Sequence, residues 1–261
     1  ELNMINKNFE LIFELTKKEF YERYKGTFGG IIWSFIQPLF LLTIYTIAFG
    51  IILKAKWSFA TNTSDYALMI FAGLLIFNGF AEVMNKSAII IKANPNFVKK
   101  ILFPIEILSI VIVLCAFINI FISIIIWIFV FYFFYGYIHI TVLYIPFIMI
   151  IFVPLLIGLS WIISSVGLII KDMPHIIGIL NHSLLFLTPI FYSLDVAPSI
   201  IHNVLIFNPL TFIIETLRSV LYYGILPQHK SLLIYFFISI VFSTFSFYIF
   251  KKIRPRFSDL L

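Results

Sequence analysis

Long apolar runs separated by short charged segments dominate the chain from residue 31 onward. Each run is close to or above the length of about 20 residues that a helix needs to cross a bilayer. The pattern predicts six spans, over residues 31–53, 66–84, 107–134, 144–170, 176–194 and 232–250. The expected fold class is therefore an all-α polytopic membrane protein, with residues 1–261 forming a single transmembrane domain.

Residues 1–30 have a different pattern, that of an amphipathic helix followed by a turn. Apolar side chains recur three or four residues apart, and charged side chains form a second stripe. The apolar stripe consists of Phe9, Ile12, Phe13, Thr16, Phe20 and Tyr24. We expect this N-terminal helix to lie in the headgroup plane of the membrane, with Gly26, Gly29 and Gly30 allowing a sharp turn into the first span.

Residues 195–230 are apolar but are interrupted by prolines and asparagines. They predict two short helices, over 199–207 and 210–223, with Asn208 as the N-cap and Pro209 at the first helical position. Neither helix is long enough to cross a bilayer. We therefore expect an external re-entrant helical hairpin between spans 5 and 6.

Two charged residues, Glu215 and Arg218, stand three apart on one face of the second short helix. In one interpretation they form an outer gate with Asn208 and Pro209 and pair with each other there. In the alternative they are a local pair that holds the helix at the outer headgroups.

The segment 86–104 between spans 2 and 3 is basic. Asn94-Pro95 marks a turn within it, because the residue before a proline leaves the helical region. A short amphipathic helix is expected after the turn, with Phe97, Val98, Ile101 and Leu102 on one face and Lys99 and Lys100 on the other. The alternative is an ordinary inner loop that follows the positive-inside rule.

Composition and charge agree with a membrane protein, since 62% of residues are hydrophobic and 11% are charged. Most of the 18 Lys and Arg residues fall in segments on one side of a six-span topology. By the positive-inside rule, both termini, residues 86–100 and Lys171 are then cytoplasmic, while Lys56 and His139 are external. The net charge of +6 reports this orientation and not nucleic-acid binding. The single cysteine, Cys115, lies within a span and excludes a disulfide inside the chain.

No catalytic or metal-binding constellation is visible, so we do not expect an enzyme. None of the 11 glycines precedes a lysine, which excludes a Walker A phosphate loop. His175 and His182 have no carboxylate or cysteine at metal-ligand spacing. Spans 3 and 4 carry no acid of the kind that ion-coupled carriers use. Energy for any transport is expected to come from another chain.

Several segments, taken in order, resemble the membrane subunits of ABC-type polysaccharide exporters, which export O-antigen, teichoic acid or capsular chains. The O-antigen branch is the most similar. The resemblance lies in YKGTFGGIIWSFIQP (24–38), NPNFVKKILFP (94–104), TPIFYSLDVAP (188–198) and FNPLTFIIETLRSVLYYG (207–224). Lys171-Asp172 stands where many relatives have Arg-Asp at an inner-face turn, which is a mild departure.

The resemblance implies a pore made of two copies of the chain in the bacterial inner membrane, each on a separate cytoplasmic ATPase subunit. That partner would bind Mg-ATP, and this chain would hold no cofactor. The substrate would be a polysaccharide on an undecaprenyl-diphosphate lipid. Residues expected to contact the ATPase are Asn94, Pro95, Phe97, Val98, Lys99, Lys100 and Ile101. Aromatic residues near polar groups, as candidates for a sugar path, are Trp33, Tyr45 and Tyr192.

Two other hypotheses stand beside this one. The first is a permease of the same broad class that exports a drug or a simple lipid. The second is a membrane-embedded acyl- or glycosyltransferase, which would need acidic or histidine pairs at a membrane face, and the sequence offers none. Neighbouring genes would distinguish a polysaccharide exporter from a drug or lipid exporter, because the ATPase subunit of a polysaccharide exporter is expected to be encoded with glycosyltransferases.

Overall fold

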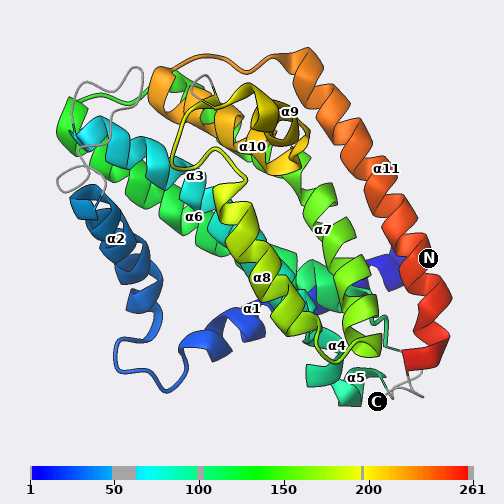
Figure 1. Cartoon of the computed structure of the whole chain (residues 1–261). Helices are drawn as coiled ribbons and strands as arrows, with labels where there is room; N and C mark the ends of the chain where they lie inside the picture. Colours follow the sequence, from blue (N-terminus) through cyan, green and yellow to red (C-terminus); the bar gives the residue numbers. More distant parts are fainter. Residues whose placement is uncertain (1, 49–62, 99–102, 195–196, 258–261) are drawn as a thin grey trace.

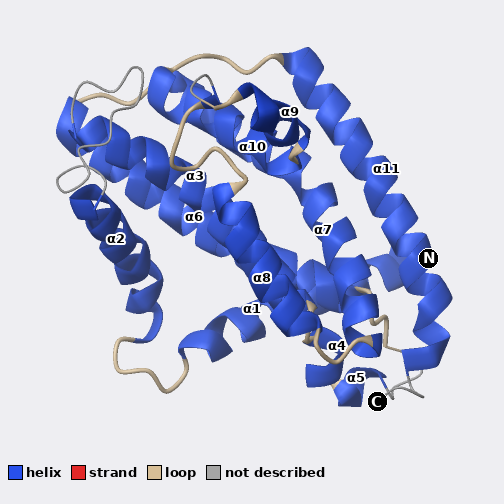
Figure 2. Ribbon diagram, in the orientation of Figure 1, coloured by secondary structure: helices blue, strands red, loops and turns tan. Residues whose placement is uncertain are grey.

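The structure is a computed structural model that describes residues 2–48, 63–98, 103–194 and 197–257. Within these ranges the regular secondary structure is helical throughout (Figure 2). The α-helices are α1 (Leu2–Tyr24), α2 (Trp33–Tyr45), α3 (Thr63–Ser87), α4 (Ile90–Ala93), α5 (Pro95–Val98), α6 (Ile107–Tyr135), α7 (Ile145–Ile169), α8 (Met173–Phe186), α9 (Ser199–Phe207), α10 (Pro209–Arg218) and α11 (His229–Ile253). Short 3-10 or π segments are η1 (Gly30–Ile32), η3 (Ile140–Tyr144), η5 (Ser219–Tyr223) and η6 (Arg254–Arg256).

In the described ranges, five helices are long and apolar enough to cross a membrane. Their bounds are Gly30–Ala48, Ser64–Ser87, Ile107–Tyr135, Ile140–Ile169 and His229–Arg256. They correspond to the predicted spans 1, 2, 3, 4 and 6. The all-α polytopic membrane fold expected from the apolar runs is thereby confirmed.

The predicted span 5 is shorter than expected. It corresponds to α8, which has 14 residues and ends at Phe186 instead of Leu194. At 1.5 Å per residue α8 is about 21 Å long, against about 30 Å for the hydrocarbon core. The helix ends here because Pro189 cannot donate a backbone hydrogen bond and disfavours helical geometry at Thr188. Residues 187–194, the α8 break, continue without regular helix.

The hairpin after the α8 break has the predicted anatomy. Helices α9 and α10 meet at Asn208 and, with α10 extended by η5, are bent by 83°. The Asn208 side chain accepts a hydrogen bond from the backbone N–H of Leu210 at 2.9 Å, which caps α10, and Pro209 is its first residue. Gly224 ends the element with a positive φ of 64°. Both helices lie at the end of the molecule opposite α1, α4 and α5 (Figure 1).

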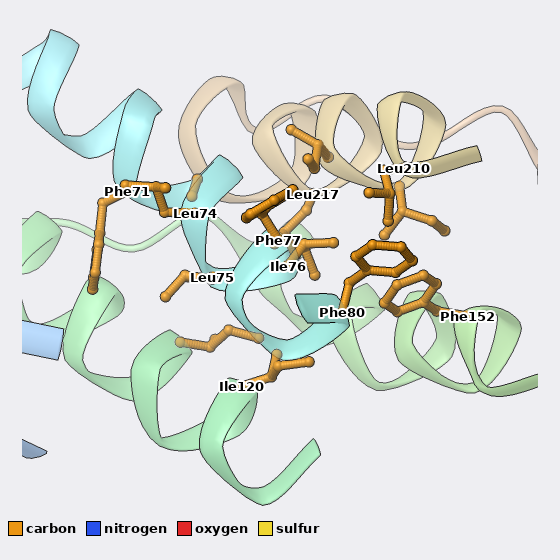
Figure 3. Packing of buried hydrophobic residues seen from close by; sticks show 14 of the residues in the cluster. Phe71, Leu74, Leu75, Ile76, Phe77, Phe80, Ile120, Phe152, Leu210 and Leu217 are labelled. Atoms are coloured by element: carbon orange, nitrogen blue, oxygen red, sulfur yellow. The ribbon is translucent and has the colours of Figure 1, made fainter. Parts of the chain in front are cut away.

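Helix α3 is the centre of the packing. In the apolar span of α3, 83% of the residues are buried, whereas the buried share is 11% in the span of α2 and 17% in that of α11. Its apolar side chains contact α6, α7 and α10, as Figure 3 shows for Phe71, Leu74, Phe77 and Phe80. At Gly79 the helix pair α3–α6 is so close that an added Cβ would lie 2.3 Å from Cδ1 of Ile120. Small residues at such crossings allow the close approach that drives helix association in membranes.

Helix α1 packs on the N-terminal end of α6 with only part of its predicted apolar stripe. Ile12 and Phe20 lie against a small cluster formed by Ile107, Val111 and Cys115 of α6. Two other residues of the predicted stripe, Phe9 and Phe13, are exposed. The stripe therefore divides between contacts inside the chain and a free apolar face, which suits a helix at a membrane surface.

Candidate functional site

A cavity of about 590 Å³ lies between α1, α2, α3 and α6. Its polar lining comes from all four helices and includes Arg23, Gln37, Asn78, Glu82, Asn85 and Asn119. Asn78, Glu82 and Asn85 have i, i+4, i+7 spacing, which places them on one face of the otherwise apolar α3. That spacing, with the amide of Gln37 inside the first span, is the sign of the cavity in the sequence.

Glu82 joins three helices at the wall of this cavity. One carboxylate oxygen pairs with Arg23 of α1, and the other accepts a hydrogen bond from Asn119 of α6 at 2.9 Å. Lys86, one turn along α3, binds Glu19 of α1 at 2.7 Å and lies 3.9 Å from Glu82. Burial lowers the pKa of Arg23, but the Glu82 carboxylate outweighs burial and holds this pKa above its usual value. The guanidinium therefore stays charged, and two ion pairs fasten α1 to α3.

The three aromatic residues predicted for a sugar path do not share one site. Trp33 lines the cavity and is 45% exposed. Tyr45, at the far end of α2, packs with its ring centroid 6.1 Å from that of Phe191. Tyr192 belongs to the α8 break and donates to the Phe186 carbonyl at 2.8 Å. The fold places the three candidates apart, and of them Trp33 lies beside the polar group of the cavity.

A second polar site surrounds the α8 break. A helix end leaves unpaired carbonyls, and inside a membrane each needs a partner from the protein. Every backbone carbonyl from residue 186 to 191 accepts a hydrogen bond. The side chains of Tyr192 and Asn208 donate to residues 186 and 187, and the backbone N–H of Ile190 donates to residue 188. Arg218 donates to residues 189 and 190, and the Tyr66 hydroxyl donates to residue 191. The break is thus satisfied largely by side chains of other elements.

Arg218 is the main donor to the α8 break and is 1% exposed. Its guanidinium donates to the carbonyls of Pro189 at 2.5 Å, Ile190 at 2.8 Å and Met69 at 3.0 Å. Gly73 provides the necessary space, since an added Cβ there would lie 2.8 Å from Nη2 of Arg218. Arg218 thus binds α3, α10 and the α8 break together.

These contacts favour a structural role for Arg218 over the outer gate. A guanidinium held by three backbone carbonyls in the interior of the chain is not a surface group facing a pore mouth. Its ion pair with Glu215, at 2.7 Å, is made within the same helix, and Glu215 is 34% exposed. Asn208 likewise holds the break, because its amide donates to the Leu187 carbonyl at 3.0 Å and to the Thr188 hydroxyl at 2.9 Å.

The expected ATPase-coupling segment begins as predicted. The Asn94 side chain donates to the Ile90 carbonyl at 2.9 Å and ends α4, and Pro95 begins α5. The described part of the expected apolar face packs inside the chain, however. Val98 is buried beside Ile91, Ile105 and Leu168, and Phe97 stacks on Phe103 at a centroid distance of 4.4 Å.

Val98 is thus unavailable to a partner subunit, which corrects the prediction for that residue. It instead attaches the segment to the N-terminal end of α6 and the C-terminal ends of α7 and α11. Lys99, Lys100 and Ile101 lie outside the described residues. The exposed side chain of α5 is Asn96.

The inner-face turn places Lys171 and Asp172 at the surface, where both side chains are exposed. The backbone carbonyl of Asp172 accepts from His175 at 3.0 Å and from Ile176 at 3.1 Å, which starts α8. Over the described ranges, no group of three or more His, Cys, Asp or Glu side chains is placed to hold a metal ion.

The helical spans, the interface helix and the polar cavity together define a polytopic membrane protein of the permease type. The chain belongs to the ABC-2 type transporter family, whose pattern matches residues 10–222. This match confirms the resemblance to ABC-type export permeases found in the sequence, and the family implies an ATPase partner subunit.

Three curated relatives are similar to the chain over nearly its whole length. Two are O-antigen export system permease proteins RfbA of Klebsiella pneumoniae, 26% and 27% identical over 254 residues, covering 97% of this chain and 95% of each relative. A third, from Myxococcus xanthus and with the same name, is 22% identical over 251 residues, covering 95% of this chain and 94% of the relative.

Proposed function

We propose that the chain is the permease subunit of an ATP-driven exporter that carries a lipid-linked, O-antigen-like polysaccharide across the bacterial inner membrane. Membership of the ABC-2 family and the names of the relatives support this proposal. The lipid carrier is undecaprenyl diphosphate in this proposal. Mg-ATP is bound by a separate cytoplasmic ATPase subunit, and the chain itself holds no cofactor.

The proposal rests most directly on the open polar face of α8. His175, His182 and Ser183 are exposed on this helix, next to the exposed apolar residues Ile179 and Phe186. The Ser183 hydroxyl and Nδ1 of His182 bond carbonyls of their own helix, at 2.9 Å and 2.7 Å. The remaining imidazole nitrogens at membrane depth are expected to face a water-filled path or a protein partner, not lipid. A second copy of the chain facing α8 and the sparsely buried α2 would supply both. Two copies would thus enclose a pore.

The same arrangement assigns the two ends of the folded molecule to the two sides of the membrane. The end that carries α1, α4, α5 and both termini would be cytoplasmic, with α4 and α5 contacting the ATPase subunit (Figure 1). The end that carries α9 and α10 would be external. Membrane lipids would surround the exposed apolar faces of the spans.

Deletion of the chain in the bacterium that encodes it tests the function. We expect surface polysaccharide to be lost and lipid-linked polymer to accumulate at the inner membrane. The chain should restore export together with its ATPase subunit, but not with an ATPase subunit that lacks its Walker A lysine. Unchanged surface polysaccharide in the deletion strain would contradict the proposal. Export of a teichoic acid, a capsular polysaccharide, a drug or a simple lipid would then be examined instead.

A further inference from the structure

The cavity between α1, α2, α3 and α6 contains polar groups that the described protein leaves without partners. Gln37 of α2 and Asn78 of α3 both line it, and neither side chain makes a hydrogen bond within the described ranges. Asn85 accepts from Asn181 at 3.0 Å, and its own amide donors are not used by the described residues. Each amide offers two donors and an acceptor, and all three side chains are exposed. The cavity therefore presents amide groups that are open to a polar ligand.

Trp33 adds a fourth group of the same kind. The indole N–H of Trp127 donates to the Leu68 carbonyl and that of Trp161 to the Glu106 carbonyl, at 2.8 Å and 3.2 Å. The indole N–H of Trp33 has no such acceptor among the described residues, although the ring lines the cavity. Its position depends on Gly29, where an added Cβ would lie 2.9 Å from Nε1 of Trp33. The cavity thus presents an aromatic surface with a free donor.

The charges of the cavity are already balanced. Arg23 and Glu82 are the charged residues in its described lining, and they pair with each other. An anionic ligand would have to displace Glu82, whose second oxygen is held by Asn119. Glu82 would then keep only the longer contact with Lys86 at 3.9 Å, and weakening an ion pair in a partly buried site is unfavourable. The electrostatics therefore favour an uncharged ligand over a phosphate.

We propose that this cavity binds a neutral, hydroxyl-rich group, a sugar of the exported polymer, with Gln37, Asn78 and Asn85 bonding its hydroxyls and Trp33 contacting its ring. The inference rests on the proposed function and assigns the carbohydrate to a site within each chain. Free amides match hydroxyl groups, which both donate and accept. The volume of about 590 Å³ is within the usual range of small-ligand sites.

The test uses the full permease with its ATPase subunit and measures binding by titration with native mass spectrometry. Three probes separate sugar from phosphate: a polyprenyl diphosphate that carries a disaccharide, the same lipid without sugar, and the free disaccharide. Asn78→Leu and Gln37→Leu should each weaken binding of the sugar-bearing lipid and of the free disaccharide about tenfold. Binding of the sugarless lipid should not change. Asn203→Leu, the same type of change on an exposed residue of α9, is the control and should bind like the wild type.

Each outcome separates the inference from the proposed function. If the wild-type complex binds the two lipids equally well and ignores the free disaccharide, carbohydrate recognition fails as a whole, and the proposed function loses its support. If the wild type prefers the sugar-bearing lipid but the cavity variants keep that preference, only the cavity assignment is overturned. An equal loss for both lipids would assign the cavity to the phosphate group and overturn the neutral site.

Discussion

At the scale of single residues, the polar side chains of this membrane protein are used mainly to satisfy backbone. Asn208 caps α10 with its oxygen and binds the α8 break with its nitrogen. Arg218 supplies donors to two carbonyls that no helix can pair, those of Pro189 and Ile190, and a further one to the Met69 carbonyl of α3. The break in α8 is therefore a built feature, because the partners of its carbonyls come from α3 and α10.

Replacement of Arg218 tests this role. Arg218→Ala leaves the carbonyls of Pro189 and Ile190 without donors in the interior, so we expect a loss of about 3 kcal/mol in the free energy of unfolding. The purified protein should melt at a clearly lower temperature, as followed by fluorescence-detected size exclusion. Glu215→Gln is the matched control, since Glu215 is partly exposed and binds none of these carbonyls. Normal melting of the Arg218 variant with altered export would instead favour a gate.

At the scale of elements, the short helices α4 and α5 lie at the surface of the molecule and pack against the ends of three spans, α6, α7 and α11. Val98 and Ile91 pack against Leu108 of α6, Leu168 of α7 and Phe250 of α11. Arg254 reinforces this cluster by pairing with Glu106 at 3.2 Å and donating to the Phe103 carbonyl, also at 3.2 Å. A displacement of α5 by a partner would therefore reach the inner ends of α6, α7 and α11 through direct packing.

A photo-crosslinker placed in α5 tests whether this surface contacts the ATPase subunit. With p-benzoylphenylalanine in place of Asn96, illumination of membranes should join the permease to its ATPase subunit, because Asn96 is exposed beside the buried Val98. The same crosslinker in place of Asn203, at the opposite end of the molecule, should not capture it. Capture from Asn203 alone would reverse the proposed orientation, and capture from neither would make residues 86–104 an ordinary loop.

At the scale of the whole molecule, the chain is unevenly packed, with a dense centre at α3 and sparse cover on α2, α8 and α11. The exposed face of α8 carries both polar and apolar residues, which is typical of a surface between protein copies and a water path. The long exposed face of α11 is apolar at Leu233, Phe237 and Val241, and is suited to lipid. The two faces therefore predict where a second copy does and does not bind.

Cysteine crosslinking between copies measures this difference. In a Cys115→Ser background, His182→Cys should form a dimer with a short bifunctional maleimide in native membranes, because α8 would face its counterpart across a two-fold axis. Phe237→Cys is the control, since Phe237 is 69% exposed on α11 and should contact lipid. A dimer through Phe237 and none through His182 would place the second copy on α11 and remove α8 from the pore.

The apolar runs, the interface helix and the capped hairpin could be read from the sequence, because each is a local property. A helix in lipid must pair its backbone N–H and C=O groups within itself. Its length, and chain breaks such as those at Pro189 and Asn208, can therefore be predicted from neighbouring residues. The early end of α8 had a visible signal in Thr188-Pro189, although the span was predicted to continue beyond it.

The partners of the polar side chains could only be decided by the tertiary structure. Arg218 binds Met69 across 149 residues of sequence, and Arg23 binds Glu82 across 59. The face of α5 that looked free for a partner is covered at Val98 by the ends of three distant helices. Such contacts depend on which helices pack side by side, and lipid-facing and protein-facing sides of a span have nearly the same apolar composition. Hydrophobicity therefore shows where the chain crosses the membrane, while helix packing decides which polar groups meet.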